Sequence, residues 1–126
     1  MIDHIADKVC ALLEVHQRSG HSPIPSTRYR DLFDLVVFAH TATIDAQSLS
    51  AALHSEAVRR SLALPDRLTK PRGSGWAAGY ARVARETPQL AERDLDAALV
   101  TAGRLIDPVL MGGFAARWDP GVLAWR

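Results

Sequence analysis

Two aspartates lie in a strongly apolar stretch of the chain that runs from Ser26 to His40. Asp31 and Asp34 are three residues apart, so on a helix they share a face and lie close enough to perturb each other's protonation. Leucine, valine and phenylalanine occupy most positions around them, and an unpaired carboxylate in such surroundings is strongly disfavoured. The two carboxylates therefore need cations or hydrogen-bond donors nearby.

Three cations are available to these carboxylates. Arg28 and Arg30 lie on the same stretch, and Arg30 precedes Asp34 by four residues, the spacing at which side chains pair on a helix. Lys8 lies at the edge of an earlier apolar stripe, and we expect its ammonium to reach Asp31 or Asp34. Two interpretations stay open for the group: a structural ion-pair network that holds the helix in register, or a pre-organised charged site.

The helical period predicts the elements that position these charges. Apolar residues recur at helical spacing over residues 2–17, which predicts a first helix. Glycine and proline in residues 18–25 predict a loop that brings the chain back. Ser26 or Thr27 then caps a central helix that runs to His40, and its apolar residues go nearly all the way round, as in a helix of the interior.

Three further helices are expected. A short turn over residues 41–44 leads to Asp45, a good N-cap for a third helix that packs antiparallel to the central one. Ser74 caps a fourth helix. A fifth helix runs from about Glu92 to Ile106, and Pro108 closes it.

The C-terminal tail has a different pattern. An Asp119-Pro120-Gly121 turn between short apolar arms predicts a small hairpin or an irregular lid, in which Trp118 and Trp125 close the core. The predicted fold class is therefore all-α, a bundle of about five helices with a short irregular or hairpin tail. Residues 1–126 form one helical domain on this interpretation.

Composition excludes several classes of protein. A hydrophobic content of 48% and a charged content of 23% are ordinary globular values, and a formal net charge of +1 neither requires nor excludes a nucleic-acid partner. The single Cys10 rules out an internal disulfide and suits a reducing compartment. No apolar run approaches the ~20 residues that span a bilayer, and the N-terminus lacks the pattern of a secretory signal. We expect a cytoplasmic protein without a membrane partner.

Basic residues gather in and beside a long loop over residues 62–75. They are Arg59, Arg60, Arg67, Lys70 and Arg72, against one acid, Asp66. A loop of that charge can bind phosphates, and Arg67, Lys70 and Arg72 are the candidates for substrate binding there. The alternative is solubilising charge on an exposed loop.

Common catalytic and metal motifs are absent from the sequence. None of the five histidines has the spacing of a zinc site with Cys10 or a carboxylate, so no metal site is expected. Gly73-Ser74 followed by Asp94 and Asp96 superficially matches the Gly-Ser and Asp-x-Asp elements of nucleotidyltransferases. The gap is about twice too long, and the two aspartates fall in the first turns of a helix, where acids complement the helix dipole.

Two short motifs together resemble the C-terminal motifs of the AbiEii/AbiGii family of nucleotidyltransferase toxins. They are Ala6-Asp7-Lys8 and the run Ser26-Thr27-Arg28-Tyr29-Arg30-Asp31-Leu32-Phe33-Asp34-Leu35. The basic loop, Trp76 with Tyr80, the run Asp107 to Leu110 and the tryptophan-rich tail look like actinobacterial members of the family.

The resemblance implies roles for the charged residues. Lys8 would contact the triphosphate, Asp31 would be the catalytic or base-like carboxylate, and Asp34 with Arg28 and Arg30 would position it. Members act in toxin–antitoxin systems and are thought to transfer nucleotides from a nucleoside triphosphate, with Mg²⁺, to a target such as tRNA. An antitoxin partner is implied in the same way.

The resemblance also implies a missing part. In the family, an N-terminal α/β half carries the Gly-Ser and Asp-x-Asp elements for nucleotide and metal, and this chain begins after it. We therefore expect a truncated or split enzyme that is inactive alone and has no cofactor of its own. In the split case its other half is on another chain. The alternatives are a non-enzymatic helical module that binds RNA or an antitoxin, and a folded relic.

Overall fold

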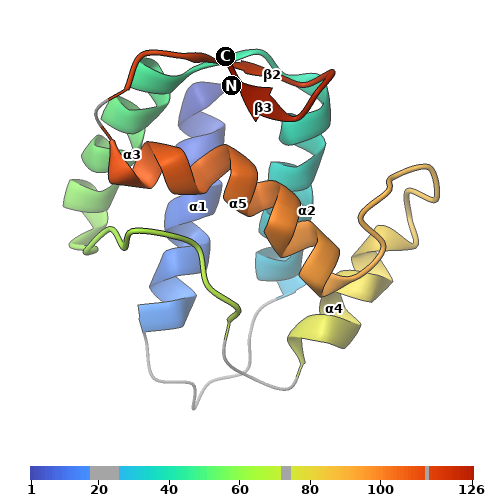
Figure 1. Cartoon of the computed structure of the whole chain (residues 1–126). Coiled ribbons are helices and arrows are strands. Elements are labelled where there is room, and N and C mark those ends of the chain that lie inside the picture. The colour runs from blue at the N-terminus through green and yellow to red at the C-terminus, as the bar shows by residue number, and fades with distance from the viewer. Residues whose placement is uncertain (18–25, 72–74, 113) are drawn as a thin grey trace.

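The computed structural model describes residues 1–17, 26–71, 75–112 and 114–126, and these form five helices and a small sheet (Figure 1). The helices are α1 (Ile2–Gln17), α2 (Ser26–Thr41), α3 (Ala46–Arg60), α4 (Trp76–Ala84) and α5 (Leu95–Met111). The strands are β1 (Ile44–Asp45), β2 (Arg117–Asp119) and β3 (Ala124–Trp125). The prediction of a five-helix, mostly helical fold with a short C-terminal hairpin is confirmed.

Helix α1 packs between α2 and α3, and α5 crosses in front of α1 and α2 (Figure 1). Helix α4 lies to one side, against the N-terminal end of α2, and α2 contacts α1, α4 and α5. The central helix therefore contacts three of the other four helices, as its apolar composition indicates. The predicted packing of the third helix against the central one is wrong, because α3 packs mainly on α1. None of the helices in the described part of the chain is long and apolar enough to cross a membrane.

Short polar side chains set where the helices begin. The carboxylate of Asp45 accepts a hydrogen bond from the backbone N–H of Ser48 at 2.9 Å, which confirms it as the N-cap of α3. Asp94 caps α5 in the same way through the N–H of Ala97. Helix α4 follows Gly75, which makes no side-chain cap; the predicted cap Ser74 lies outside the described residues.

The predicted end of the fifth helix is wrong. Helix α5 continues through Pro108 to Met111 instead of closing at the proline. Proline removes one backbone donor from a helix interior, but Val109 and Leu110 are buried in this last turn. Burying two aliphatic side chains contributes a few kcal/mol, which outweighs one missing hydrogen bond.

The segment after α2 was predicted as a turn, and part of it is a strand. Ile44 and Asp45 form β1, which pairs antiparallel with β2 so that Ile44 lies opposite Trp118. Both of these side chains are fully buried, so pairing removes them from water. The hairpin prediction is confirmed, because β2 pairs with β3 and places Trp118 opposite Trp125.

The tryptophans close the core at this end of the bundle, as predicted. The indole N–H of Trp118 donates to the carbonyl of Ala39 at 2.8 Å, and that of Trp125 donates to the carbonyl of Leu105 at 3.0 Å. Each indole therefore buries its rings without leaving its donor unpaired. The sheet is in this way bonded to both α2 and α5.

Candidate functional site

Lys8 lies between the two aspartates of α2. Its Nζ atom is 2.7 Å from Oδ2 of Asp34 and 3.5 Å from Oδ1 of Asp31. Arg28 reaches the other oxygen of Asp31, with Nη1 to Oδ2 at 2.8 Å. The expectation that Lys8 reaches these carboxylates is confirmed, and we call Lys8, Arg28, Asp31 and Asp34 the Lys8 cluster.

Buried neighbours fix the backbone under each member of the cluster. Ile5 and Val9 on α1 are fully buried on either side of Lys8, and Leu32 and Leu35 on α2 are buried beside the two aspartates. Neither helix can rotate without exposing these side chains, which would cost about 1.5–3 kcal/mol each. The hydrophobic pattern of both helices therefore sets the geometry of the charged groups between them.

The side chains of the Lys8 cluster differ in their solvent exposure. The side chain of Asp31 is 13% exposed, that of Lys8 is 21% exposed and that of Asp34 is 40% exposed. Asp31 is thus the member most removed from water, while Lys8 and Asp34 stay accessible to a ligand. Charge held at the edge of an apolar interior acts more strongly on a bound group than the same charge in water.

Burial and pairing shift two pKa values in this cluster. Burial lowers the pKa of Lys8, but the hydrogen bond to Asp34 and the charges of both aspartates outweigh it, so the pKa is raised and the ammonium stays charged. Burial raises the pKa of Asp31 above its ordinary value, although Arg28 and Lys8 act in the opposite direction. A carboxylate with a raised pKa holds a proton more readily, which is the property a general base needs.

Arg30 was predicted to pair with Asp34, but it pairs with another residue. Its Nη2 lies 2.8 Å from Oε1 of Glu86, just beyond α4, and both side chains are about half exposed. The hydrogen bond that Arg30 donates to Glu86 is also the largest cause of the raised pKa of Arg30. Asp34 already has Lys8 as its close partner, so Arg30 is free to bridge α2 to the end of α4.

The basic loop does not join the Lys8 cluster. Lys70 Nζ lies 3.5 Å from Oδ1 of Asp96 on α5, and the charge of Arg67 acts on Asp107 of the same helix. Burial nevertheless raises the pKa of Asp107 overall, and its carboxylate accepts from the N–H of Leu68 at 2.7 Å. Arg72, the third candidate of the loop, lies outside the described residues.

The remaining cations predicted for this region are neutralised on another face. Arg60 bonds to Asp7 and Glu14 on α1 and to Glu56 on its own helix, and Arg59 also pairs with Glu56. This network joins α1 to α3. Cys10 lies close to it, and burial raises the pKa of the Cys10 thiol to about 11, so the thiol is inert.

A second buried polar network, around Glu92, was not predicted from the sequence. Glu92 is 5% exposed, and its carboxylate accepts from the hydroxyl of Thr101 at 2.5 Å and bonds to Nε2 of His40 at 2.9 Å. Burial would raise the pKa of Glu92, but the bonds to Thr101 and His40 lower it, so the carboxylate is ionised. Tyr80 donates its hydroxyl to the backbone carbonyl of Glu92 at 2.8 Å. No sequence spacing signals this network, because its members come from α2, α4, α5 and a loop.

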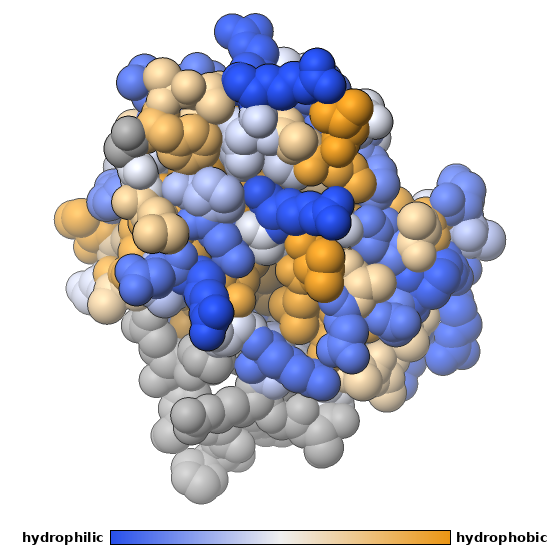
Figure 2. Space-filling model, viewed as in Figure 1, coloured by the Kyte–Doolittle hydropathy of each residue, from blue (hydrophilic) through white to orange (hydrophobic). Residues whose placement is uncertain are grey.

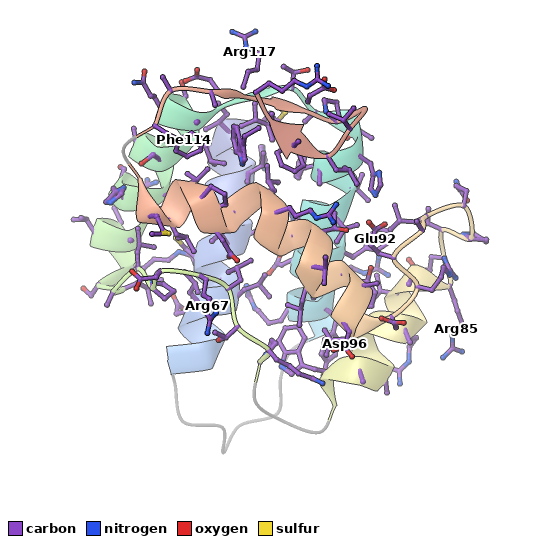
Figure 3. The ribbon with its side chains drawn as sticks, viewed as in Figure 1. Arg67, Arg85, Glu92, Asp96, Phe114 and Arg117 are labelled. Atoms are coloured by element: carbon purple, nitrogen blue, oxygen red, sulfur yellow. The ribbon has the colours of Figure 1, made fainter. Side chains whose placement is uncertain are left out.

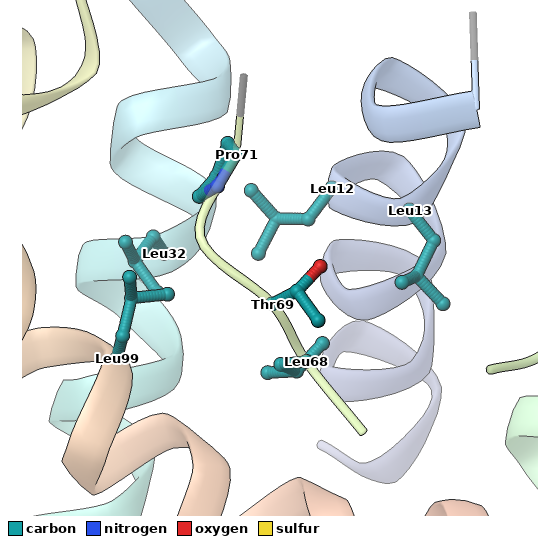
Figure 4. Close-up of a pocket in the computed structure, with 7 residues that line it drawn as sticks. All are labelled: Leu12, Leu13, Leu32, Leu68, Thr69, Pro71 and Leu99. Atoms are coloured by element: carbon teal, nitrogen blue, oxygen red, sulfur yellow. The ribbon is translucent and has the colours of Figure 1, made fainter. Parts of the chain in front are cut away.

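An apolar pocket lies beside α1 and α2, but it is too small for a nucleotide. It is lined by Leu12, Leu13, Leu32, Leu68, Thr69, Pro71 and Leu99 (Figure 4). Its volume of about 20 Å³ has room for roughly one water molecule. A ligand of the Lys8 cluster would therefore lie on the open side of the cluster, near Asp34.

The carboxylates of the cluster do not fit a metal site. Both are bonded to cations, whereas Mg²⁺ takes carboxylate oxygens and water in octahedral geometry. Over the described residues, no group of three or more histidine, cysteine, aspartate or glutamate side chains is placed to hold a metal ion. The arrangement suits binding of an anionic group by Lys8 and proton transfer by Asp31.

Comparison with known proteins gives one match. A family model described as "Nucleotidyl transferase AbiEii toxin, Type IV TA system" matches residues 2–101, which include α1 to α4, the first part of α5 and the whole Lys8 cluster. The comparisons with curated proteins and with solved structures each gave no significant match.

Proposed function

Because the chain belongs to the AbiEii family of nucleotidyltransferase toxins, we propose that the Lys8 cluster takes part in transfer of a nucleotide from a nucleoside triphosphate to an RNA acceptor such as tRNA. The observation that carries this proposal is the position of Lys8, whose ammonium lies within 3.5 Å of both Asp31 and Asp34 at the edge of the core. A lysine and two carboxylates fixed in this way form a pre-organised charged site.

Lys8 binds the triphosphate in this proposal. Its ammonium is charged, partly exposed and carried on a flexible stem, so it can turn from Asp34 toward a phosphate oxygen. Asp34 holds the ammonium in place before the ligand arrives. This pre-organisation reduces the ordering cost of binding.

Asp31 receives the proton of the acceptor hydroxyl. Its raised pKa supports this role, because a carboxylate of ordinary pKa is a weaker base. Arg28, at 2.8 Å, holds one oxygen of Asp31 and leaves the orientation of the carboxylate fixed. Arg28 is therefore a positioning residue, and Asp31 is the catalytic carboxylate.

The metal ion of the family's reaction is held elsewhere in this proposal. When bound, Mg²⁺ neutralises the charge that develops on the phosphoryl group. Asp31 and Asp34 are both engaged by cations, and this supports the inference that metal-binding carboxylates come from another polypeptide segment. The chain then works as one part of a split enzyme and has little transfer activity alone.

Membership of a toxin–antitoxin family implies an antitoxin partner. Because nucleoside triphosphates and tRNA are cytoplasmic, we place the reaction in the cytoplasm. A non-enzymatic module that only binds RNA or the antitoxin would keep its partner without needing the Lys8 cluster. The two functions therefore differ in their dependence on Lys8 and Asp31.

A transfer assay separates these possibilities. The chain is incubated with labelled nucleoside triphosphates, Mg²⁺ and total tRNA, with and without a polypeptide that carries the Gly-Ser and Asp-x-Asp elements. We expect labelled tRNA only in the complete mixture, and loss of labelling with Lys8→Met or Asp31→Asn. Labelling that survives both substitutions would contradict the assignment of the site. Strong labelling by the chain alone would contradict the split.

A further inference from the structure

The exposed face of α4 carries cations that have no ion-pair partner among the described residues. Arg82 and Arg85 are exposed and three residues apart, so they share a face of the helix. Arg85 projects from the outer side of α4, away from the body of the molecule (Figure 3). Hydrophilic side chains gather over this outer end (Figure 2). Lys70 and Arg60, in contrast, are neutralised by nearby carboxylates.

This face is joined to the Lys8 cluster by a run of polar contacts. Arg30 and Asp34 are four residues apart on one face of α2, and Asp34 contributes to the raised pKa of Arg30. Arg30 bonds to Glu86 at 2.8 Å, and Glu86 directly follows Arg85. One surface therefore leads from Lys8 across α2 to the end of α4.

Close packing fixes α4 at this place. The ring of Tyr29 lies against the backbone of Gly79, where an added Cβ would be 2.4 Å from a ring carbon. The same ring meets Trp76 edge-on, with the ring centroids 4.9 Å apart. Tyr29 directly precedes Arg30. The packing contact that fixes α4 therefore lies next to the Arg30–Glu86 ion pair, which joins α2 to the end of α4.

We propose that the Arg82 and Arg85 face of α4 binds the phosphate backbone of a nucleic acid strand and holds it against the Lys8 cluster. The proposal rests on the proposed function, in which that cluster acts on an RNA acceptor. Arginine forms bidentate hydrogen bonds with phosphate, and small exposed residues at Ala77 and Ala78 let a backbone approach the helix closely.

The composition of the face favours nucleic acid over a membrane surface. A helix that lies on a membrane needs large apolar side chains next to its basic ones. The large apolar residues of α4, Trp76 and Tyr80, are 1% and 0% exposed. Binding to a lipid surface is therefore an alternative outcome for the experiment.

Fluorescence anisotropy with a labelled RNA oligonucleotide tests the proposal. The double variant Arg82→Gln/Arg85→Gln removes the two cations, and Arg104→Gln/Arg117→Gln is the matched control, since these arginines are also exposed but lie on α5 and β2. We expect the α4 variant to weaken RNA binding about tenfold or more and to lower the slope of log K against log salt by about 2. The control should bind like the wild type. A DNA strand of the same sequence should show the same dependence, because phosphate contacts do not read the base.

Three results would overturn the proposal: no RNA binding by the wild-type chain, equal weakening in both double variants, or binding to phosphatidylserine vesicles in place of RNA. Circular dichroism of each variant checks that α4 remains folded, and Arg82→Lys/Arg85→Lys should restore binding in part. The assay needs no nucleoside triphosphate and no transfer. A failure here therefore leaves the proposed function standing, while a Lys8 variant that transfers normally would refute the function and leave this surface intact.

Discussion

Gly79 on α4 lies directly against the ring of Tyr29 on α2, and its substitution by alanine gives a sharp prediction. A Cβ atom there would lie 2.4 to 2.6 Å from three carbons of the Tyr29 ring. Non-bonded carbon atoms do not come this close, so the ring or the helix must move. Overpacking of this kind costs about 1–3 kcal/mol. Replacing glycine by alanine inside a helix otherwise stabilises by about 1 kcal/mol.

The net effect of Gly79→Ala should therefore be a loss of up to about 2 kcal/mol in the free energy of unfolding. Urea denaturation followed by circular dichroism measures it. With a denaturant slope of about 2 kcal/mol per molar, the midpoint should fall by up to roughly 1 M. The displaced α4 should also bind RNA more weakly, because Arg85 would move relative to Arg30.

A chain that lacks the Tyr29 ring tests whether the clash with this ring causes the loss of stability. In a Tyr29→Ala chain the ring is absent, so Gly79→Ala should now stabilise by about 1 kcal/mol. The sign of the effect should thus reverse between the two backgrounds. If Gly79→Ala stabilises the wild-type chain as well, the close packing of Tyr29 on α4 is refuted.

Two further substitutions have defined outcomes. Glu92→Ala should lower the free energy of unfolding by about 2–4 kcal/mol at neutral pH, because it removes a buried acceptor from Thr101 and His40. The pKa of Glu92 is lowered, so its contribution is present above the unfolded pKa and is lost as pH falls through the folded one. The difference between Glu92→Ala and the wild type in urea denaturation should therefore shrink in acid. Asp31→Asn should abolish labelling of tRNA in the complete transfer mixture without lowering the melting temperature at neutral pH. Because the pKa of Asp31 is raised, the stability it contributes is present below its unfolded pKa and is lost as pH rises through the folded one. A clear loss of stability in Asp31→Asn would contradict this reasoning.

The parts of the fold that follow from local pattern were predictable. Helical periodicity predicted all five helices. Asp45 was predictable as a cap because capping is local: its side chain bonds to a backbone group only three residues away. The errors came where tertiary burial decided the outcome. Val109 and Leu110 draw α5 past Pro108, and Trp118 draws Ile44 into a strand. Neither effect can be read from the residues of one segment.

The same distinction applies to the charged residues. The contact of Lys8 with Asp31 and Asp34 was predictable, since two carboxylates in an apolar helix need a cation and few were available. The partner of Arg30 was not predictable, because Glu86 is 56 residues away in the sequence and the competing Asp34 lies at ideal helical spacing. The network around Glu92 was missed for the same reason. Its donors are contributed by elements far apart in the sequence.

Binding of a nucleoside triphosphate tests most directly the central claim that Lys8 binds the triphosphate, because binding depends on the Lys8 cluster and does not require the rest of the reaction. Equilibrium dialysis with labelled nucleoside triphosphates and Mg²⁺ compares the wild type, Lys8→Met and a control, Lys70→Met. Lys70 is an exposed lysine whose only ion pair among the described residues is with Asp96 at 3.5 Å. A charge-assisted hydrogen bond of about 1.5–3 kcal/mol predicts that Lys8→Met binds about ten- to a hundredfold more weakly, while Lys70→Met binds like the wild type. Equal binding by Lys8→Met and the wild type, with both chains folded by circular dichroism, would contradict the assignment of this cluster.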